Sequence, residues 1–147
     1  MLVVAATERE LANIRGADTF CCGIGPVEAA LQTAMALAEL RPESVLHIGI
    51  AGARGIEPPA LVLGSESVYC DVIDAGSTLP RIERLEPDAG LLARVHAALP
   101  EAHVLPIATC GKVGAGTGCE VEAMEGFGVL RAAGRRSPPS QIGRAHV

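Results

Sequence analysis

The chain has 147 residues, which is enough for one domain that buries about two-thirds of the surface its unfolded chain exposes. Hydrophobic residues make up 49% of it, so disorder is not expected, while aromatic residues are only 2%, too few for the stacking surfaces of single-strand nucleic-acid binders. A net charge of −5 also argues against a nucleic-acid partner, and neither a membrane span nor a signal peptide is apparent. We therefore expect a cytoplasmic protein.

The five cysteines are odd in number and show no Cys-x-x-Cys spacing. Neither a structural zinc site nor a disulfide framework is predicted from such a pattern. We expect no metal and no cofactor.

Short apolar runs bounded by turn residues predict strands, and longer alanine-rich stretches with helix-start and helix-stop residues predict helices. Pro26 stands at a first helical position and Asp88 at an N-cap. Strands that alternate with helices indicate an α/β fold with a mainly parallel sheet. The predicted strands are residues 2–6, 18–22, 44–50, 61–73 (one long strand or a strand pair) and 103–109, and the predicted helices are residues 27–40, 89–99 and 120–133.

The C-terminal residues differ from the rest of the chain. Residues 134–147 contain two adjacent arginines and two adjacent prolines, and they have no apolar periodicity. One back-translation of residues 141–147 contains the opening of a common sequencing-library adapter. We therefore interpret residues 134–147 as an artefactual tail outside the domain of residues 1–133.

Two glycine-rich segments suggest phosphate binding at first sight. Residues 23–30 (GIGPVEAA) form a strand-to-helix turn, but they follow the second strand and lack the expected acid at the end of the next one. Residues 111–118 (GKVGAGTG) have lysine and threonine in the wrong order for a P-loop. We interpret the first as a tight turn with close helix packing and the second as a loop suited to ligand contact.

Carboxylates follow the first predicted strand. Glu8 and Glu10 lie where ligands bind in parallel sheets, beyond the carboxyl end of a strand. Acids are also ordinary in the first turn of a helix, and this explanation is preferred for Glu8. His47 is interpreted as a core residue. Asp71 and Asp74 can be read as a carboxylate pair, although turn chemistry accounts for Asp74.

A second acidic cluster opens the last predicted helix. Glu122 and Glu125 are three residues apart and would share one helix face, whereas Glu120 would point elsewhere. Met124 and Gly126 flank Glu125, and a glycine inside a helix costs about 1 kcal/mol relative to alanine. The glycine therefore predicts that another group approaches the helix closely.

Taken in order, four segments resemble the nucleoside phosphorylase and nucleosidase superfamily, over residues 1–133. The resemblance implies a three-layer α/β fold in which helices flank a mainly parallel central sheet, incomplete at the C-terminus. It also implies a homodimer, since family members are often dimers. The matching segments are residues 6–10 (ATERE), 23–30 (GIGPVEAA), 49–52 (GIAG) and 122–126 (EAMEG).

Members of this superfamily cleave the N-ribosidic bond of purine nucleosides, with water or phosphate as the acceptor. The segments that would supply phosphate-binding arginines contain none here, so the resemblance favours the nucleosidase branch. The Glu-x-Met-Glu-Gly pattern is similar to futalosine hydrolase, which releases hypoxanthine in an alternative menaquinone pathway. The alternative is a methylthioadenosine/S-adenosylhomocysteine nucleosidase, which reads Val-Glu-Met-Glu near this point.

The resemblance also implies roles for residues at matched positions. Glu125 would hold the ribose hydroxyls, and Glu10 would position or deprotonate the attacking water. The substrates would be a small nucleoside and water, with no metal and no cofactor. The remaining substrate-binding positions are Ile50, Ala51, Gly52 and Met124.

Family enzymes carry a general acid on one further central strand, and no segment after residue 133 resembles it. Losing general acid catalysis typically costs about 10²–10⁴-fold in rate. We therefore expect an exposed sheet edge, poor stability and little activity. Two other functions stay open, namely a non-catalytic nucleoside-binding domain and, more distantly, a dinucleotide-binding module.

Overall fold

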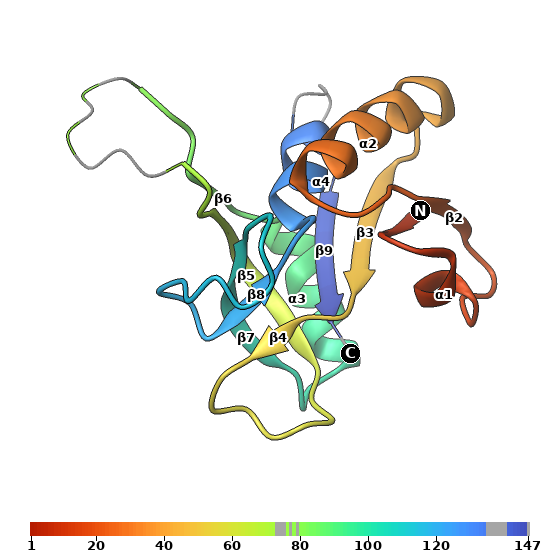
Figure 1. Ribbon diagram of the computed structural model, residues 1–147. Helices are drawn as coiled ribbons and strands as arrows, with labels where there is room; N and C mark the ends of the chain where they lie inside the picture. The colour runs from red at the N-terminus through yellow and green to blue at the C-terminus, as the bar shows by residue number, and fades with distance from the viewer. Residues whose placement is uncertain (73–75, 77, 79, 135–140, 147) are drawn as a thin grey trace.

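The computed structural model describes residues 1–72, 76, 78, 80–134 and 141–146 (Figure 1). Its strands join into one mixed sheet in the order β2-β1-β3-β9-β5-β7-β8-β4, and β6 pairs with β5. The strands are β1 (Leu2–Ala5), β2 (Asp18–Cys21), β3 (Ser44–Gly49), β4 (Gly52–Ala53), β5 (Val62–Tyr69), β6 (Arg84–Leu85), β7 (His103–Thr109), β8 (Val121–Ala123) and β9 (Gln141–His146).

Most strand pairs in the sheet are parallel, as the sequence predicts. Strand β1 pairs in parallel with β2 and β3, and β7 pairs in parallel with β5 and β8. Strand β9 joins these two groups, since it pairs in parallel with β3 and antiparallel with β5. The predicted α/β class with a mainly parallel sheet is confirmed.

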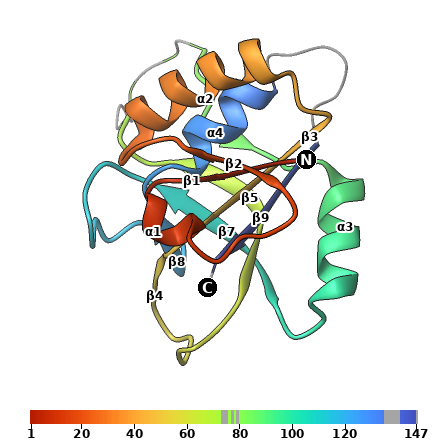
Figure 2. The same ribbon diagram turned by 90° about the vertical axis from the view of Figure 1, so that its right-hand side faces the viewer.

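Four helices of the described chain cover the sheet: α1 (Glu8–Leu11), α2 (Pro26–Leu40), α3 (Ala89–Ala98) and α4 (Gly126–Ala133). Helices α2 and α4 lie side by side, α4 contacts β5, β9 and β3 in the middle of the sheet, and α3 lies against β5 and β9 (Figure 2). None of the described helices is long and apolar enough to cross a bilayer.

Both faces of β1 are buried, which explains why its sequence is a continuous apolar run. Leu2 and Val4 pack with residues of α2 and α4, while Val3 and Ala5 pack with Leu11 of α1 on the opposite face. A second core lies between β5, β7 and β8. The helices therefore fix the strand ends of the β1–β3 half from two sides.

The predicted helix starts follow from local chemistry. Pro26 opens α2 directly after Gly25, whose φ of 94° is a conformation that only glycine adopts easily. Asp88 caps α3 by accepting a hydrogen bond from the Leu91 N–H at 2.7 Å. These two boundaries agree with the sequence predictions.

The prediction of one helix over residues 120–133 is wrong at its start. Val121–Ala123 forms strand β8, Glu125 is the N-cap, and helix α4 begins at Gly126. Glu122 and Glu125 therefore do not share a helix face, and Glu120 does not start a helix. Val121 pairs with the apolar strand β7 on one side and with β4 on the other, and its side chain is fully buried there.

A close approach to the last helix occurs at Gly128, which the sequence analysis did not single out, whereas Gly126, the glycine on which the prediction rested, is the first residue of α4. A Cβ at Gly128 would lie 2.5 Å from the Pro26 carbonyl oxygen and 2.9 Å from the Ala30 nitrogen. Both atoms belong to the backbone of α2, so the glycine lets the two helices touch.

The expected gap at the C-terminal end of the sheet is also corrected. The backbone of Gln141–His146 forms β9 between β3 and β5, where the sequence analysis expected a missing strand and an exposed edge. Six successive residues of β3 pair with it in register, from Ser44 to Gly49. The assignment of residues 134–147 to a tail outside the family domain stays a prediction.

Candidate active site

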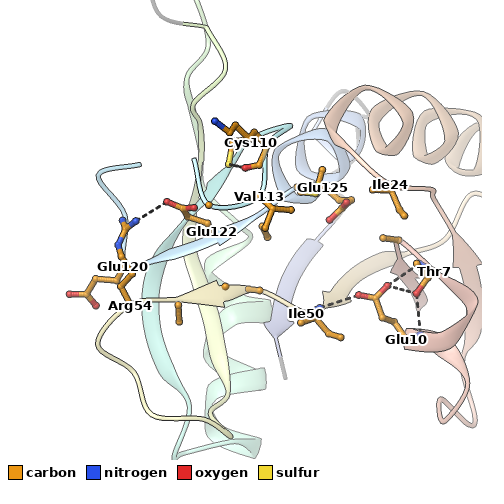
Figure 3. A pocket seen from close by; sticks show the side chains of 18 of the residues that line it. Thr7, Glu10, Ile24, Ile50, Arg54, Cys110, Val113, Glu120, Glu122 and Glu125 are labelled. Atoms are coloured by element: carbon orange, nitrogen blue, oxygen red, sulfur yellow. Dashed lines mark hydrogen bonds and ion pairs between the residues drawn. The ribbon is translucent and has the colours of Figure 1, made fainter. Parts of the chain in front are cut away.

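A pocket of about 770 Å³ lies where several strands end (Figure 3). Its lining includes Thr7 after β1, Ile24 after β2, Ile50 after β3, Cys110 after β7 and Met124 after β8. Carboxyl ends of strands are the usual position of ligand sites in such sheets. The sequence analysis placed Glu10 at one of these ends and Glu125 in a predicted helix, and the structure brings both acids to one pocket.

Glu10 is held rigidly at the β1 end of the pocket. Its Oε2 accepts hydrogen bonds from the Thr7 N–H at 2.9 Å and the Thr7 hydroxyl at 2.8 Å, and its Oε1 accepts from the Ile50 N–H at 3.0 Å. Thr7 also caps α1 through its side chain, completing a reciprocal capping box. Glu10 thus links helix α1 to the end of β3, and none of these donors carries a charge.

Glu125 reaches the same pocket from the other end of the chain. It is only 8% exposed, and its Oε1 accepts a hydrogen bond from the Gly25 N–H at 2.9 Å. Within the described residues, its Oε2 accepts no hydrogen bond. Because Gly25 precedes α2 and Glu125 precedes α4, the contact of these two helices fixes the carboxylate.

The thiol of Cys22 lies behind these two carboxylates. Burial raises its pKa to about 12, and the negative charge of Glu125 and, more weakly, of Glu10 adds to the effect. The thiol therefore stays neutral at ordinary pH.

The opposite side of the pocket carries a third acid with different partners. Oε1 of Glu122 accepts from the Thr117 N–H and hydroxyl, both at 2.8 Å, and forms an ion pair with Arg54 at 3.1 Å. The hydrogen bonds of Thr117, followed by the charge of Arg54, lower the pKa of Glu122 below its ordinary value. Sequence reasoning missed Arg54, because the residue that pairs with Glu122 lies 68 positions earlier in the chain.

The predicted substrate-binding residues all line the pocket. Ile50, Ala51 and Gly52 follow β3, and Met124 precedes Glu125. Ile24 and Val113 also line it, and the sequence analysis did not single them out. Ile50 is 72% exposed and Val113 is 84% exposed, so these apolar side chains are available to cover a ligand.

The other candidate residues lie outside this arrangement. His47 is fully buried in β3, as predicted for a core residue. Asp71 accepts hydrogen bonds from the Gly111 N–H at 2.9 and 3.0 Å, at the start of the glycine-rich loop. Asp74 lies outside the described residues. No group of three His, Cys, Asp or Glu side chains suited to a metal occurs in the described part of the chain.

The fold of the chain is similar to that of solved nucleosidases. The 5′-methylthioadenosine/S-adenosylhomocysteine nucleosidase of Colwellia psychrerythraea, in complex with adenine, matches with a TM-score of 0.81 and 20% identity over 98% of this chain and 79% of that one. The Streptococcus pneumoniae enzyme in complex with 8-aminoadenine gives a TM-score of 0.80 and 22% identity over 99% and 84%. A futalosine hydrolase mutant of Helicobacter pylori gives 0.78 and 16% over 99% and 84%.

No curated protein sequence matches the chain. A family model described as the phosphorylase superfamily matches residues 19–132, which include the whole of α2 and α3, most of β2 and α4, and the acids Glu122 and Glu125. This match covers well over half of the 147 residues. The chain therefore belongs to the phosphorylase superfamily.

Proposed function

We propose that this protein is a purine nucleosidase that hydrolyses the N-ribosidic bond of a small nucleoside, with Glu10 and Glu125 as its catalytic residues. The observation that carries the proposal is the convergence of these two carboxylates on one pocket, each held by uncharged donors. The relatives in complex with adenine and 8-aminoadenine support a purine as the base.

Cleavage of a ribosidic bond develops positive charge on the sugar, as in glycoside hydrolysis. The free Oε2 of Glu125 would accept a hydrogen bond from a ribose hydroxyl, and that bond strengthens as the charge grows. Glu10 would orient a water molecule toward C1′ and take its proton as the new C–O bond forms. The bond to the base breaks with its electron pair, and the base takes up a proton from solvent.

The apolar lining would handle the uncharged parts of the substrate. Met124 is half-buried beside Glu125, where it would pack on the ribose. Residues 50–52 follow β3 beside Glu10, and they would line the pocket around the substrate. Burial of these surfaces strengthens the electrostatic effect of the carboxylates, because water is displaced from between them and the sugar.

For the substrate, we favour futalosine over methylthioadenosine or S-adenosylhomocysteine, because the spacing of Glu122, Met124 and Glu125 is Glu-x-Met-Glu-Gly. The experiment incubates high concentrations of the purified protein with each nucleoside and measures free hypoxanthine and adenine by chromatography. We expect slow release of hypoxanthine from futalosine, at least about 10²-fold slower with Glu125→Gln, because the amide cannot stabilise positive charge in the same way.

Glu120→Gln is the matched control, since Glu120 also lines the pocket but is exposed. Its rate should equal that of the original protein. Release of adenine from methylthioadenosine alone would reassign the substrate. Calorimetric binding of a nucleoside without any release, and unchanged by Glu125→Gln, would instead favour a non-catalytic nucleoside-binding domain.

The proposed function includes a homodimer, formed through an exposed apolar row on α2. Val27, Leu31 and Met35 are spaced by four residues, so they lie on one face of the helix, and they are 76%, 54% and 60% exposed. A cavity of about 470 Å³ lies beside the row, lined by Val27, Leu31 and the stacked rings of Tyr69 and Phe127. The row begins near Ile24, so the interface would be continuous with the active-site pocket.

A helix row that packs against its own copy about a two-fold axis is self-complementary. Sedimentation equilibrium should give a dimer for the original chain and a monomer for Leu31→Glu. Glu39→Gln, at the exposed end of the same helix, serves as the control. A monomer at all protein concentrations in the original chain would overturn this part of the proposal.

A further inference from the structure

The loop between β7 and β8 forms one wall of the pocket. It spans residues 110–120, and Lys112, Val113 and Gly114 line the pocket from it. Gly114 and Gly116 have positive φ angles of 67° and 72°, which other residues adopt only with strain. A segment with this many glycines loses a large conformational entropy when it is fixed in one position.

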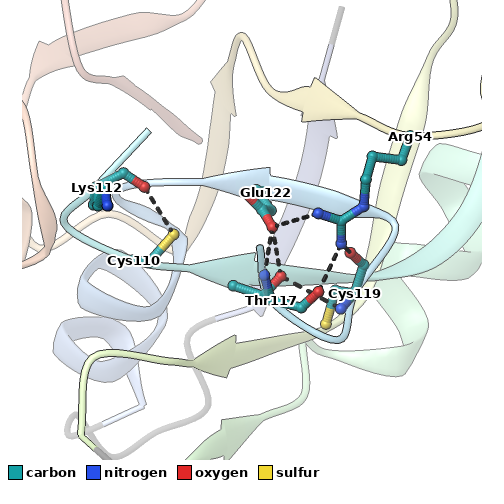
Figure 4. A network of polar contacts seen from close by, with 6 residues as sticks. All are labelled: Arg54, Cys110, Lys112, Thr117, Cys119 and Glu122. Atoms are coloured by element: carbon teal, nitrogen blue, oxygen red, sulfur yellow. Dashed lines mark hydrogen bonds and ion pairs between the residues drawn. The ribbon is translucent and has the colours of Figure 1, made fainter. Parts of the chain in front are cut away.

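Arg54 and Glu122 supply contacts that offset this loss (Figure 4). Nη2 of Arg54 donates to the carbonyl oxygens of Thr117 and Cys119 at 2.6 and 2.5 Å, and Nη1 pairs with Oε1 of Glu122 at 3.1 Å. The same Oε1 accepts from the Thr117 N–H and hydroxyl. Two side chains, Arg54 just after β4 and Glu122 in β8, therefore hold both polar groups of the Thr117 backbone and the carbonyl of Cys119.

The geometry of these contacts is suited to holding the loop in place rather than to reacting with a ligand. Both charges are used within the network, and Glu122 is bound by a guanidinium and a hydroxyl at once. Strands β4 and β8 are themselves paired, and the Arg54 N–H donates to the Glu120 carbonyl at 2.9 Å. The network is thus anchored on the sheet. Its contribution is to fix the position of the C-terminal end of the loop.

We propose that Arg54 and Glu122 are positioning residues that hold the β7–β8 loop as the pocket wall opposite Glu10 and so keep Val113 over the bound nucleoside. This inference rests on the proposed nucleosidase function for its ligand. Figure 3 shows Val113 between Glu122 and Glu125, on the side of the pocket that faces Glu10 and Ile50. Its exposed side chain gains a partner when a ligand fills the pocket.

The chain offers a direct probe of the loop, because Lys112 is its only lysine. A lysine-specific endoprotease can therefore cut the protein at one peptide bond, between Lys112 and Val113. Cleavage of a folded protein requires local opening, so its rate reports how firmly the loop is held. We expect Arg54→Met and Glu122→Gln each to raise the rate of this cut by about tenfold.

The matched control is Arg15→Met, which removes another arginine that donates to two backbone carbonyls, those of Ala12 and Ile14. This variant should be cut at the original rate. Melting temperatures of all variants, and a cut made well below them, separate loop opening from global unfolding. Equal cleavage rates for the original protein, Arg54→Met and Glu122→Gln would overturn the proposal.

Ligand binding gives a measurement that distinguishes a positioning network from one that only stabilises the fold. Saturating adenine or hypoxanthine should slow the cut in the original protein and protect Arg54→Met much less. In steady-state kinetics, Arg54→Met should raise KM by about tenfold with kcat within about twofold, since a loss of ground-state binding leaves the chemical step intact. A fall in kcat with unchanged KM would overturn the positioning role.

These experiments separate the inference from the function on which it rests. Faster cleavage in the variants without turnover of any nucleoside would remove the proposed function and leave the loop network standing. Turnover of a nucleoside with equal cleavage rates and equal KM values in the original protein and the variants would remove the loop network and leave the proposed function standing.

Discussion

Glu122 and Glu125 are three residues apart and line the same pocket, yet they are held in opposite ways. Glu122 lies in strand β8, where Arg54 and Thr117 use its Oε1 in several contacts. Glu125 is the N-cap of α4, where a single backbone N–H from Gly25 binds it. The hydrogen-bond partners, and not the residue type or the pocket, therefore distinguish a carboxylate that holds structure from one that keeps an oxygen free.

Glu10 belongs with Glu125 in this comparison, and it provides the largest expected effect. Glu10→Gln should lower turnover by about 10²–10⁴-fold, because an amide cannot take the proton of the attacking water. The substitution also turns one oxygen into a donor that faces the N–H of Ile50 or Thr7, so the melting temperature should fall as well.

The control for this variant is Glu8→Gln, an exposed acid in the same short helix. Its turnover and melting temperature should both match those of the original protein. If Glu10→Gln lost stability but kept its rate, Glu10 would belong with Glu122 as a structural acid.

The grouping of Glu10 with Glu125 could be predicted from the sequence, but the separation of Glu122 from Glu125 could not. The sequence places Glu10 just after a strand, where ligands bind in parallel sheets, and the resemblance to a known family names it together with Glu125. The position of Glu122 depends on β7 and β4, which make residues 121–123 a strand instead of the first turn of a helix.

Contacts between distant residues limited the sequence analysis in the same way elsewhere. Arg54 is 68 residues away from Glu122 in sequence, so no local pattern connects them. Strand β9 was missed because Gln141–His146 shows no apolar run, and its pairing with β3 and β5 involves backbone groups. In contrast, the predicted strand at residues 103–109 and the cap at Asp88 are correct, since their signals lie within a few residues.

A substitution at Gly128 tests whether the position of Glu125 depends on the contact between α2 and α4. Gly128→Ala would place a methyl group 2.5 Å from the Pro26 carbonyl oxygen and 2.9 Å from the Ala30 nitrogen, so α2 and α4 must separate. Overpacking of this kind destabilises a protein by about 1–3 kcal/mol. Urea denaturation should detect this loss, and turnover should also fall because Gly25 moves away from Glu125.

The control for Gly128→Ala is Gly118→Ala, because a Cβ at Gly118 meets no atom within 4 Å. The two sides of the pocket should respond independently, so the lysine-specific cut of native Gly128→Ala should keep its original rate. A faster cut, measured under conditions where the variant is fully folded, would show that the two sides are coupled.

The lowered pKa of Glu122 gives a smaller, pH-dependent effect on the loop side. A carboxylate with a depressed folded pKa contributes stability above its unfolded pKa and loses it as the pH falls through the folded value. The stability difference between the original protein and Glu122→Gln should therefore persist from pH 7 to pH 5 and disappear only below the ordinary glutamate range. Denaturant titrations at several pH values measure it, and a difference already lost at pH 5 would contradict the network.

The smallest expected difference between the two sides of the pocket is in the reactivity of one thiol on each side, Cys22 and Cys119. Cys22 is fully buried behind Glu125, and burial followed by the charge of Glu125 raises its pKa to about 12. Burial also raises the pKa of Cys119 on the loop side, but Arg84 opposes this effect and Cys119 is only half-buried. Since the thiolate is the reactive form, iodoacetamide at pH 8 should modify Cys119 before Cys22 in the native protein, as followed by mass spectrometry of peptides.

Glu125→Gln removes one of the two main causes of the raised pKa of Cys22 but leaves the thiol buried, so Cys119 should still react first. A Cys22 that reacts first in either protein would mean that the Glu125 side of the pocket opens to solvent more readily than the loop side.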